Sequence, residues 1–320
     1  MVPKYIVLKG KINEDILSGV YPLDSKLPTE VELAQIYNVS RSTVRQALEL
    51  LVNDGIISKK WGSGNTVISK NDSSKKSTVM LLLPEIKSLA AANLIEDIST
   101  TLLKEGLTVE CHETVQQLSI EREHLSTMLT EIYCGLIISP ALSGLPSTNS
   151  DIMHQLLKRQ LPIIFLESAP SGIYNTTVVA SNCYDKGYQM ARRFINSGKK
   201  ALGGIFLRDS ASSIASFSGF VDAIRDAGLS ICDSCFLWCN SVDPVGINTR
   251  SSAFINKFLK QALELVDVVY LDDDRISTDS AFPVATCPLE LSKSLGKETA
   301  RAFLELKKNG NTKSIAIPYH

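Results

Sequence analysis

The spacing of apolar residues changes once along the 320-residue chain, and the change divides it in two. In the first part apolar positions recur at helical spacing, which predicts amphipathic helices. From Val79 onward short continuous apolar runs alternate with amphipathic segments, which is typical of a parallel sheet covered by helices on both faces. We therefore predict a helical domain over residues 1–68 and a two-lobed α/β domain over residues 78–320.

Five apolar runs define the strands expected in the second part. They lie at residues 79–83, 135–138, 162–166, 204–207 and 268–271. Helices are expected between them, around residues 95–103, 152–157, 188–195, 217–224 and 254–265. Residues 69–77 contain no apolar side chain and are expected to form an exposed linker.

Residues 27–51 predict two short helices joined by a tight turn. Thr29 and Glu32 match a capping box. In this motif the Thr side chain accepts a hydrogen bond from the backbone N–H of the Glu, and the Glu side chain accepts one from the backbone N–H of the Thr. Ser40 suits the N-cap of the second helix. A preceding helix is expected to end near Gly19, since glycine adopts the left-handed conformation that follows many helices. The apolar stripe of that preceding helix is Tyr5, Leu8, Ile12 and Ile16.

The second helix of this pair has two contrasting faces. The spacing i, i+3, i+4, i+7 predicts a buried face made of Val44, Ala47, Leu48 and Leu51. The outer face at its N-terminal end is left with Arg41, Ser42, Thr43, Arg45 and Gln46. A guanidinium fork can pair with O6 and N7 of guanine, and each such pair provides roughly 1–3 kcal/mol of discrimination. The helix is therefore expected to read the major groove of DNA.

Two short β-type runs, at residues 56–57 and 67–68, predict a hairpin beside this helix. Glycines at a hairpin tip permit positive φ and let the backbone approach a partner closely. The hairpin residues expected to meet DNA are Lys59, Lys60, Gly62, Ser63 and Gly64. The alternative is an ordinary three-helix core with a solvated hairpin, but the joint register of caps, turn and arginine face favours a winged helix-turn-helix.

Residues 1–68 resemble the DNA-binding domain of the GntR family of bacterial regulators. The matching segments are residues 27–30, 32–34, 39–45, 55–57 and 62–64. The resemblance implies base contacts from Arg41 and Arg45, backbone contacts from Thr29 and Thr43, and minor-groove entry by the glycine tip. In the family an Arg that contacts DNA often follows the Pro-Ser/Thr-Glu element; Val31 stands there in this chain, so that contact is not carried over.

Residues 78–320 resemble the sugar-responsive, periplasmic-binding-protein-like domain of LacI-type regulators. The matching segments are residues 135–140, 161–165, 182–188, 219–224 and 288–291. Two positions depart from that family's pattern: Ser216 replaces the usual Arg that grips ligand hydroxyls, and Asn182 replaces the usual pocket Asp. A site without the Arg fork lacks its charge-assisted hydrogen bonds. The effector therefore differs from a typical sugar, or the pocket has been lost.

In parallel sheets ligands bind beyond the carboxyl ends of the strands, here between the two lobes. The residues expected to line such a site are Glu85, Lys87, Ser139, Glu167, Ser168, Asn182, Arg208, Asp209, Ser216 and Asp272. The alternative for each is a solvated loop residue, because loops are polar in any case. Ligand binding would favour one closure of the lobes and so change how a dimer spaces its DNA-binding domains.

The charge of each part of the chain and the spacing of its cysteines limit the classes of function that fit the sequence. Residues 1–76 hold 11 Lys and Arg against 8 Asp and Glu, and the rest of the chain holds 22 against 26, so a basic domain is attached to an acidic body. No signal peptide and no run of 18 apolar residues is apparent, which indicates a cytoplasmic protein. Cys232, Cys235 and Cys239 have the spacing of metal ligands or a redox pair, but structural zinc needs a fourth ligand, and a strand with buried thiols is the simpler interpretation.

Phosphate-binding loops, dinucleotide fingerprints and nucleophile elbows are absent from the sequence, so we expect no enzyme, cofactor or metal. The pattern as a whole predicts a homodimeric transcription regulator, a repressor, that binds a palindromic operator and responds to a small molecule such as a sugar. Two alternatives remain open: a ligand-independent DNA-binding dimer whose second domain has lost effector binding, and an enzyme or redox protein tethered to DNA.

Overall fold

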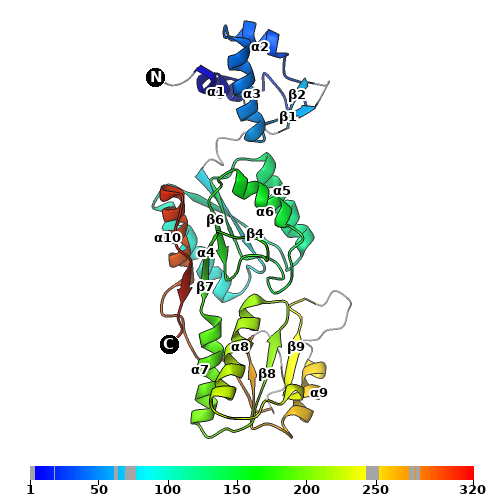
Figure 1. Cartoon of the computed structure of the whole chain (residues 1–320), viewed down its shortest axis with the longest axis vertical. Coiled ribbons are helices and arrows are strands. Elements are labelled where there is room, and N and C mark those ends of the chain that lie inside the picture. The colour runs from blue at the N-terminus through cyan, green and yellow to red at the C-terminus, as the bar shows by residue number, and fades with distance from the viewer. Residues whose placement is uncertain are drawn as a thin grey trace.

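The computed structural model describes residues 4–17, 19–60, 64–68, 77–242, 252–273, 278 and 282–320. Three bodies follow one another along its long axis: a small helical domain, a lobe with a six-stranded sheet and a lobe with a four-stranded sheet (Figure 1). The expected linker lies outside the described residues apart from Ser77. The architecture is the mixture of a winged helix-turn-helix and a two-lobed parallel α/β domain that the sequence predicts.

The helical domain contains α1 (Lys4–Leu17), α2 (Glu30–Ile36), α3 (Arg41–Asn53) and the antiparallel hairpin of β1 (Ile57–Lys60) and β2 (Gly64–Val67). The predicted stripe is confirmed at Leu8, Ile12 and Ile16, each at most 2% exposed. Gly19 has a φ of 84°, as expected after a helix. Gly62 and Ser63 lie outside the described residues.

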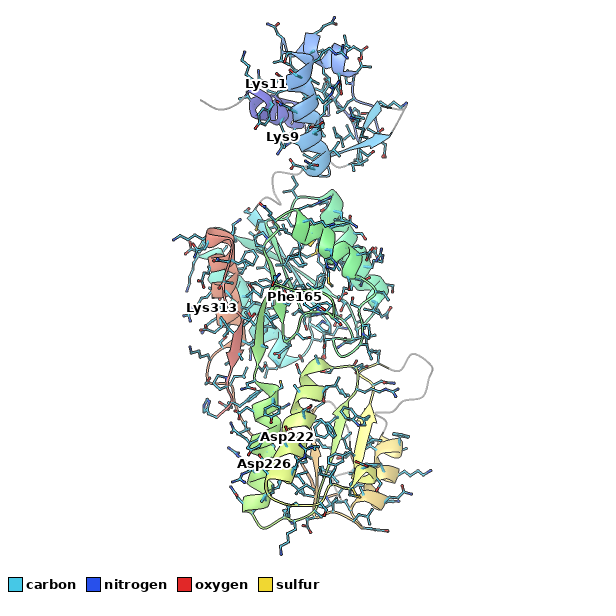
Figure 2. All side chains as sticks on the ribbon, viewed as in Figure 1. Lys9, Lys11, Phe165, Asp222, Asp226 and Lys313 are labelled. Carbon is cyan, nitrogen blue, oxygen red and sulfur yellow. The ribbon has the colours of Figure 1, made fainter. Side chains whose placement is uncertain are left out.

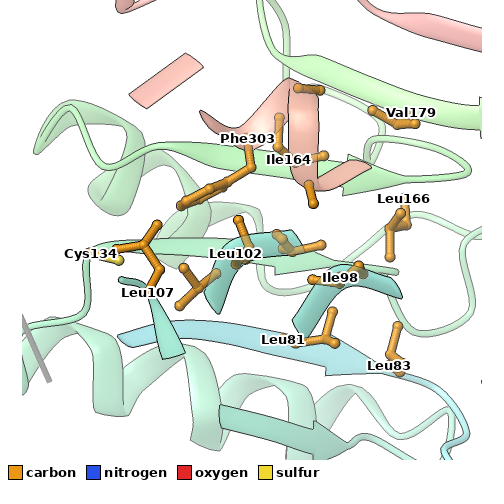
Figure 3. Packing of buried hydrophobic residues seen from close by; sticks show 14 of the residues in the cluster. Leu81, Leu83, Ile98, Leu102, Leu107, Cys134, Ile164, Leu166, Val179 and Phe303 are labelled. Carbon is orange, nitrogen blue, oxygen red and sulfur yellow. The ribbon is translucent and has the colours of Figure 1, made fainter. Parts of the chain in front are cut away.

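The first lobe is built on a sheet whose strand order is β12-β7-β6-β5-β3-β4, with every pair parallel. Its strands are β3 (Thr78–Leu83), β4 (Thr108–Glu113), β5 (Gly135–Ile138), β6 (Ile163–Leu166), β7 (Thr177–Ser181) and β12 (Ile315–Ile317). Its helices are α4 (Leu89–Leu103), α5 (Leu118–Thr130), α6 (Ser150–Lys158) and α10 (Leu295–Asn309). Phe303 of α10 packs with Cys134, Leu107 and Ile164 in the core on one face of the sheet (Figure 3). Phe165, on the other face, lies deep inside the lobe (Figure 2).

The second lobe is built on a sheet of order β11-β10-β8-β9, again parallel. Its strands are β8 (Leu202–Leu207), β9 (Phe236–Cys239), β10 (Val268–Leu271) and β11 (Val284–Ala285). Its helices are α7 (Cys183–Asn196), α8 (Ala211–Asp226), α9 (Ser252–Ala262) and the short η2 (Asp233–Cys235). Asp222 and Asp226 on α8 accept hydrogen bonds from Tyr184 and Tyr188 of α7, at 2.8 and 3.0 Å (Figure 2).

The lobes exchange chain segments, which places polar loops between them. The chain leaves the first lobe between β7 and α7 and returns to it through residues 286–294 before α10. Backbone hydrogen bonds join this returning segment to the last residues of the chain, with Glu290 and His320 bonded in both directions. The carboxyl ends of β3, β5 and β6 therefore face the second lobe.

The turn after α3 meets the first lobe. A side chain at Gly55 would place its Cβ 2.4 Å from the carbonyl oxygen of Leu129 at the end of α5. Arg159 donates to that same oxygen at 2.9 Å. Ile132 packs against the core of the helical domain. Helix α3 and the first lobe are thus in direct contact through this turn.

Candidate functional site

The start of α3 forms the first candidate site, and local capping fixes its geometry. The predicted capping box is confirmed: the Thr29 backbone N–H donates to Glu32 at 2.7 Å, and the Glu32 N–H donates to the Thr29 hydroxyl at 3.3 Å. Ser40 caps α3 and accepts from the Thr43 N–H at 3.2 Å. These bonds satisfy backbone donors that would otherwise be free, so both helices begin at defined residues.

The two faces of α3 are separated as the sequence predicts. The apolar side chains are at most 4% exposed and comprise Val44, Ala47, Leu48 and Leu51. Arg41, Ser42 and Gln46 are exposed. Thr43 is half-buried, and its hydroxyl shares a hydrogen bond of 2.7 Å with Ser40. The polar face of the helix is therefore available to a partner.

Arg45 is exposed and already held in a fork geometry. Its Nη2 and Nε donate to the two carboxylate oxygens of Glu30, at 2.9 and 3.3 Å. This hydrogen bonding lowers the pKa of Glu30. The α2 carboxylate thus orients a guanidinium that points outward from α3, which reduces the conformational entropy lost when that guanidinium binds.

The hairpin lies beside this face of α3. Arg45, Glu49, Lys59 and Asn65 line a hollow of about 260 Å³ between α3 and the hairpin, and Lys59 is exposed. Lys60 pairs with Gly64 at the end of the ladder, and Gly64 has a φ of 84°. The hairpin therefore carries positive charge and a glycine next to the arginine face.

A cavity of about 670 Å³ forms the second candidate site, at the carboxyl ends of β3, β5 and β6. It brings together three predicted residues, Glu85, Ser139 and Glu167. Its other polar lining residues include Asp97, Gln116, Glu290, Lys293 and Ser294. The wall is completed by α4 and by the segment that returns from the second lobe. Its polar lining is rich in carboxylates and hydroxyls, and every lining residue belongs to the first lobe or to the segment that returns to it, so this cavity is not the cleft between the lobes that the sequence predicts.

Glu167 is the most constrained of these residues. It follows β6 with a φ of 63°, a conformation that is uncommon for a residue with a side chain. The hydroxyl and N–H of Ser181 donate to its carboxylate at 2.6 and 3.2 Å, and Ser212 of α8 donates to it from the second lobe at 3.3 Å. Burial raises the pKa of this carboxyl group. The side chain therefore joins the two lobes.

A buried ion pair in the second lobe joins α7 to the end of β10. Lys186 Nζ and an oxygen of Asp272 are 2.8 Å apart, and the two side chains are only 12% and 3% exposed. Ser213 also donates to Asp272, at 2.5 Å. Of these residues only Asp272 is predicted from the sequence. Lys186 lies one helical turn after Asn182 in a segment that carries the LacI-type resemblance, and that spacing is the signal that could have identified it.

The other predicted lining residues lie elsewhere. Asn182 caps α7 and accepts from the Asp185 N–H at 3.2 Å, whereas Lys87 is exposed outside the cavity. Arg208 is exposed and bonds Asn240. Asp209 is 4% exposed and accepts from the Ser241 N–H and hydroxyl.

Ser168 and Ser216 each have a buried hydroxyl without a hydrogen-bond partner among the described residues. Ser216 is fully buried where α7 and α8 cross, so it does not stand on the cavity wall in place of the family's Arg.

Comparison with known proteins finds matches to both parts of the chain. The family described as "Bacterial regulatory proteins, gntR family" matches residues 4–67. The arabinose metabolism transcriptional repressor of Halalkalibacterium halodurans is 24% identical over 237 residues, which cover 72% of this chain and 63% of the relative. The chain thus spans less than two thirds of the length of that relative.

Two solved structures share the fold of the larger domain. The transcription regulator CcpA of Lactococcus lactis is 14% identical with a TM-score of 0.61, over 77% of this chain and 97% of that one. A periplasmic binding protein/LacI transcriptional regulator of Alkaliphilus metalliredigens, complexed with D-xylulofuranose, is 13% identical with a TM-score of 0.60, over 76% and 96%.

The fold defines the class of protein as a winged helix-turn-helix joined to a two-lobed α/β domain. Within that class the chain carries a GntR-family helix-turn-helix domain on a LacI-type, periplasmic-binding-protein-like fold. In the part of the chain that the structure describes, every helix is too short or too polar to cross a membrane.

Proposed function

We propose that this protein is a sequence-specific DNA-binding transcription repressor controlled by a small molecule. The observation that carries the proposal is the exposed pair Arg41 and Arg45 at the N-terminal end of α3, with a basic hairpin alongside. Such a face places guanidinium forks in the major groove while the hairpin contacts the neighbouring backbone. The named function of the arabinose metabolism repressor supports the same role.

The cavity chemistry favours a neutral, polyhydroxylated effector. Carboxylates of Glu85, Asp97, Glu167 and Glu290 line the cavity, whereas Lys293 is its only Lys or Arg among the described lining residues. Carboxylates accept hydrogen bonds from sugar hydroxyls but repel phosphate groups. A free sugar therefore fits this wall and a sugar phosphate does not. Relatives named for arabinose, and a neighbour complexed with D-xylulofuranose, agree with this class.

Operator binding is proposed to require a homodimer and a palindromic site. Leu89 and Leu103 are 78% and 64% exposed, and fourteen residues of helix place them on one face of α4. A second copy packed on this face of α4 would bury both leucines. Two-fold symmetry in the protein is then mirrored in the two operator half-sites.

Selection from random DNA, followed by fluorescence anisotropy, tests the proposal. The expected result is a palindromic consensus bound far more tightly than random duplex, with release on addition of L-arabinose or another free pentose or hexose. Arg41→Ala combined with Arg45→Ala is the matched control and is expected to abolish selection. Failure to enrich any sequence would contradict DNA reading.

The second candidate is a ligand-independent repressor. It is favoured by the buried position of Ser216, where the LacI-type family has its hydroxyl-binding Arg, and by direct hydrogen bonding between the lobes at Glu167 and Ser212. Thermal shifts measured with a panel of free sugars, sugar phosphates and amines distinguish the two. A ligand at 100 times its Kd stabilises by about 2.7 kcal/mol, which such a screen detects. Tight operator binding with no thermal shift across the panel would favour this second candidate.

A further inference from the structure

Two cysteines of the second lobe lie in thiol–thiol contact far from the cavity. Cys232 immediately precedes η2 and Cys235 ends it, just before β9. The Cys235 thiol donates to the Cys232 sulfur at 3.0 Å, and the Ser234 hydroxyl lies 3.2 Å from the same sulfur. The tight turn places the Cys235 thiol and the Ser234 hydroxyl within hydrogen-bonding distance of the Cys232 sulfur. The spacing of the two cysteines in the sequence does not by itself imply these contacts.

The two thiols have different environments. Cys232 is half-exposed, whereas Cys235 is fully buried in a core cluster of the second lobe. Hydrogen bonds from Ser234 and Cys235 lower the pKa of Cys232, whereas burial raises the pKa of Cys235 to about 11. An accessible sulfur that is stabilised as a thiolate, backed by a buried thiol, is the arrangement of a nucleophilic and a resolving cysteine.

Metal binding does not explain this pair. Among the described residues no group of three or more His, Cys, Asp or Glu side chains is arranged to hold an ion. Cys239, the third cysteine of the sequence motif, is buried at the far end of β9. Two sulfurs that share a hydrogen bond, with no third ligand among the described residues, favour dithiol chemistry instead.

We propose that Cys232 and Cys235 form a thiol–disulfide exchange site that reacts with small disulfides of the glutathione type. The Cys232 thiolate attacks one sulfur of the small disulfide, and the other sulfur leaves as a thiolate. Cys235 then loses its proton and attacks Cys232, which breaks the mixed disulfide and releases the second small thiolate. The protein loses two electrons and two protons, and the small disulfide gains them as two thiols.

Cys232 and Cys235 are not among the residues that line the cavity. Cys232 and Cys235 stand at the amino end of β9, whereas the residues that face the first lobe follow the carboxyl ends of the strands. The internal disulfide would join the start of β9 to the loop after α8. The proposed exchange site lies on the second lobe, and its reaction does not require the proposed repressor function.

Reaction of the full-length protein with the aromatic disulfide DTNB tests the proposal. The expected result is a fast phase at Cys232, about tenfold or more faster than the half-buried Cys287. Each fast event should release two nitrothiobenzoate ions and leave no adduct, because Cys235 displaces the second. Intact mass should fall by about two hydrogen masses, and dithiothreitol should restore it.

Variants separate the two roles. Cys232→Ser removes an exposed thiol and should eliminate the fast phase. Cys235→Ala should release one nitrothiobenzoate and keep the other as a stable adduct on Cys232, and circular dichroism checks that this core change leaves the fold intact. Cys287→Ser is the matched control and should leave the fast phase unchanged. A stable adduct on Cys232 in the unaltered protein, or a fast phase that survives in Cys232→Ser, would overturn the proposal.

Discussion

At the scale of the residue, the ion pair between Arg45 and Glu30 orients the Arg45 guanidinium before any partner binds. The free protein holds its guanidinium against Glu30 at 2.9 Å, and the two residues come from successive helices. A surface ion pair of this kind contributes little to stability. Its effect is directional, because a planar fork fixed on one side presents its remaining N–H groups at a defined angle.

Replacing Arg45 by Lys keeps the charge and removes the fork. We expect discrimination between the operator and random DNA to fall by roughly 1–3 kcal/mol while the salt dependence stays the same. Lys59→Ala is the contrasting variant and should weaken binding to all sequences, lowering the salt slope by about one. Anisotropy titrations over a salt series measure both quantities. Unchanged discrimination in Arg45→Lys would exclude bidentate base contact.

Glu167 carries a second residue-scale prediction. Its folded-state pKa lies above the ordinary value of 4.5, so protonation favours the folded state. The stability that depends on this proton is present below pH 4.5 and is lost as pH rises through the raised pKa. Glu167→Gln should remove this loss and raise the Tm near neutral pH.

Thermal unfolding across pH measures this effect, with Glu85→Gln on the same cavity wall as the control. The Glu85 variant should retain the pH dependence of the unaltered protein. Superimposable Tm profiles for Glu167→Gln and the unaltered protein would show that Glu167 is not the titrating group.

At the scale of the element, α7 and α8 cross at backbone contact. A Cβ on Gly187 would lie 1.9 Å from the Ser216 carbonyl oxygen, and one on Gly219 would lie 1.9 Å from that of Tyr184. Glycine is required at both positions because the neighbouring atoms belong to the opposite backbone and cannot rotate away. The packing leaves Ser216 fully buried, which is why an Arg cannot occupy this position here.

Gly187→Ala should destabilise the protein by about 1–3 kcal/mol or more, because the helices must separate to admit the methyl group. Gly10→Ala is the matched control, since Gly10 is exposed in α1 with no atom within 4 Å of the new methyl. That control should be neutral or slightly stabilising. Equal unfolding midpoints for the two variants in urea would contradict the crossing geometry.

The sequence predicts the elements that are apolar on both faces. The runs of β3, β5, β6, β8 and β10 are fully buried and were identifiable because each is continuously apolar. The edge strand β4, of sequence TVECHE, is only partly buried and mixes polar with apolar residues, so it gives no such run. A continuous apolar run in the sequence identifies a strand that is buried on both faces. It does not identify an edge strand that forms by pairing with its neighbour.

The two candidate sites also differ in how far the sequence predicts them. The face of α3 follows from helical spacing within thirteen residues, so Arg41 and Arg45 were identifiable from the sequence. The cavity is assembled from segments more than 200 residues apart in the sequence, such as those of Glu85 and Glu290 (290 − 85 = 205). Strand ends predict Glu85, Ser139 and Glu167, but they cannot show that Asp209 turns inward to bond Ser241.

At the scale of the whole molecule, the lobes meet at a glycine. The Gly144 N–H donates to the Asp209 carbonyl at 3.0 Å, and the Ala211 N–H donates to the Ser143 hydroxyl at 3.1 Å. A Cβ on Gly144 would lie 2.8 Å from backbone atoms of Asp209 and Ser210. The close approach of the two lobes therefore depends on the absence of a side chain there.

Gly144→Ala should hold the lobes apart and reduce the population of the closed form. We expect a larger radius of gyration by small-angle scattering and a weaker apparent affinity for any effector that binds the conformation in which the lobes are in contact. Ser143→Ala removes one hydrogen bond without adding bulk and should change both quantities much less. Identical scattering from Gly144→Ala and the unaltered protein would exclude this role.

The contact of Gly55 with Leu129 has a genetic consequence. Residues 54–55 follow directly after α3, so a bulky side chain in this turn is expected to rotate that helix against the lobe that holds the cavity. A screen for repressors that stay on their operator at saturating inducer is expected to recover substitutions at Gly55 and Arg159. Neither residue lies in the α3 face or the cavity wall, so such alleles would separate induction from both recognition events.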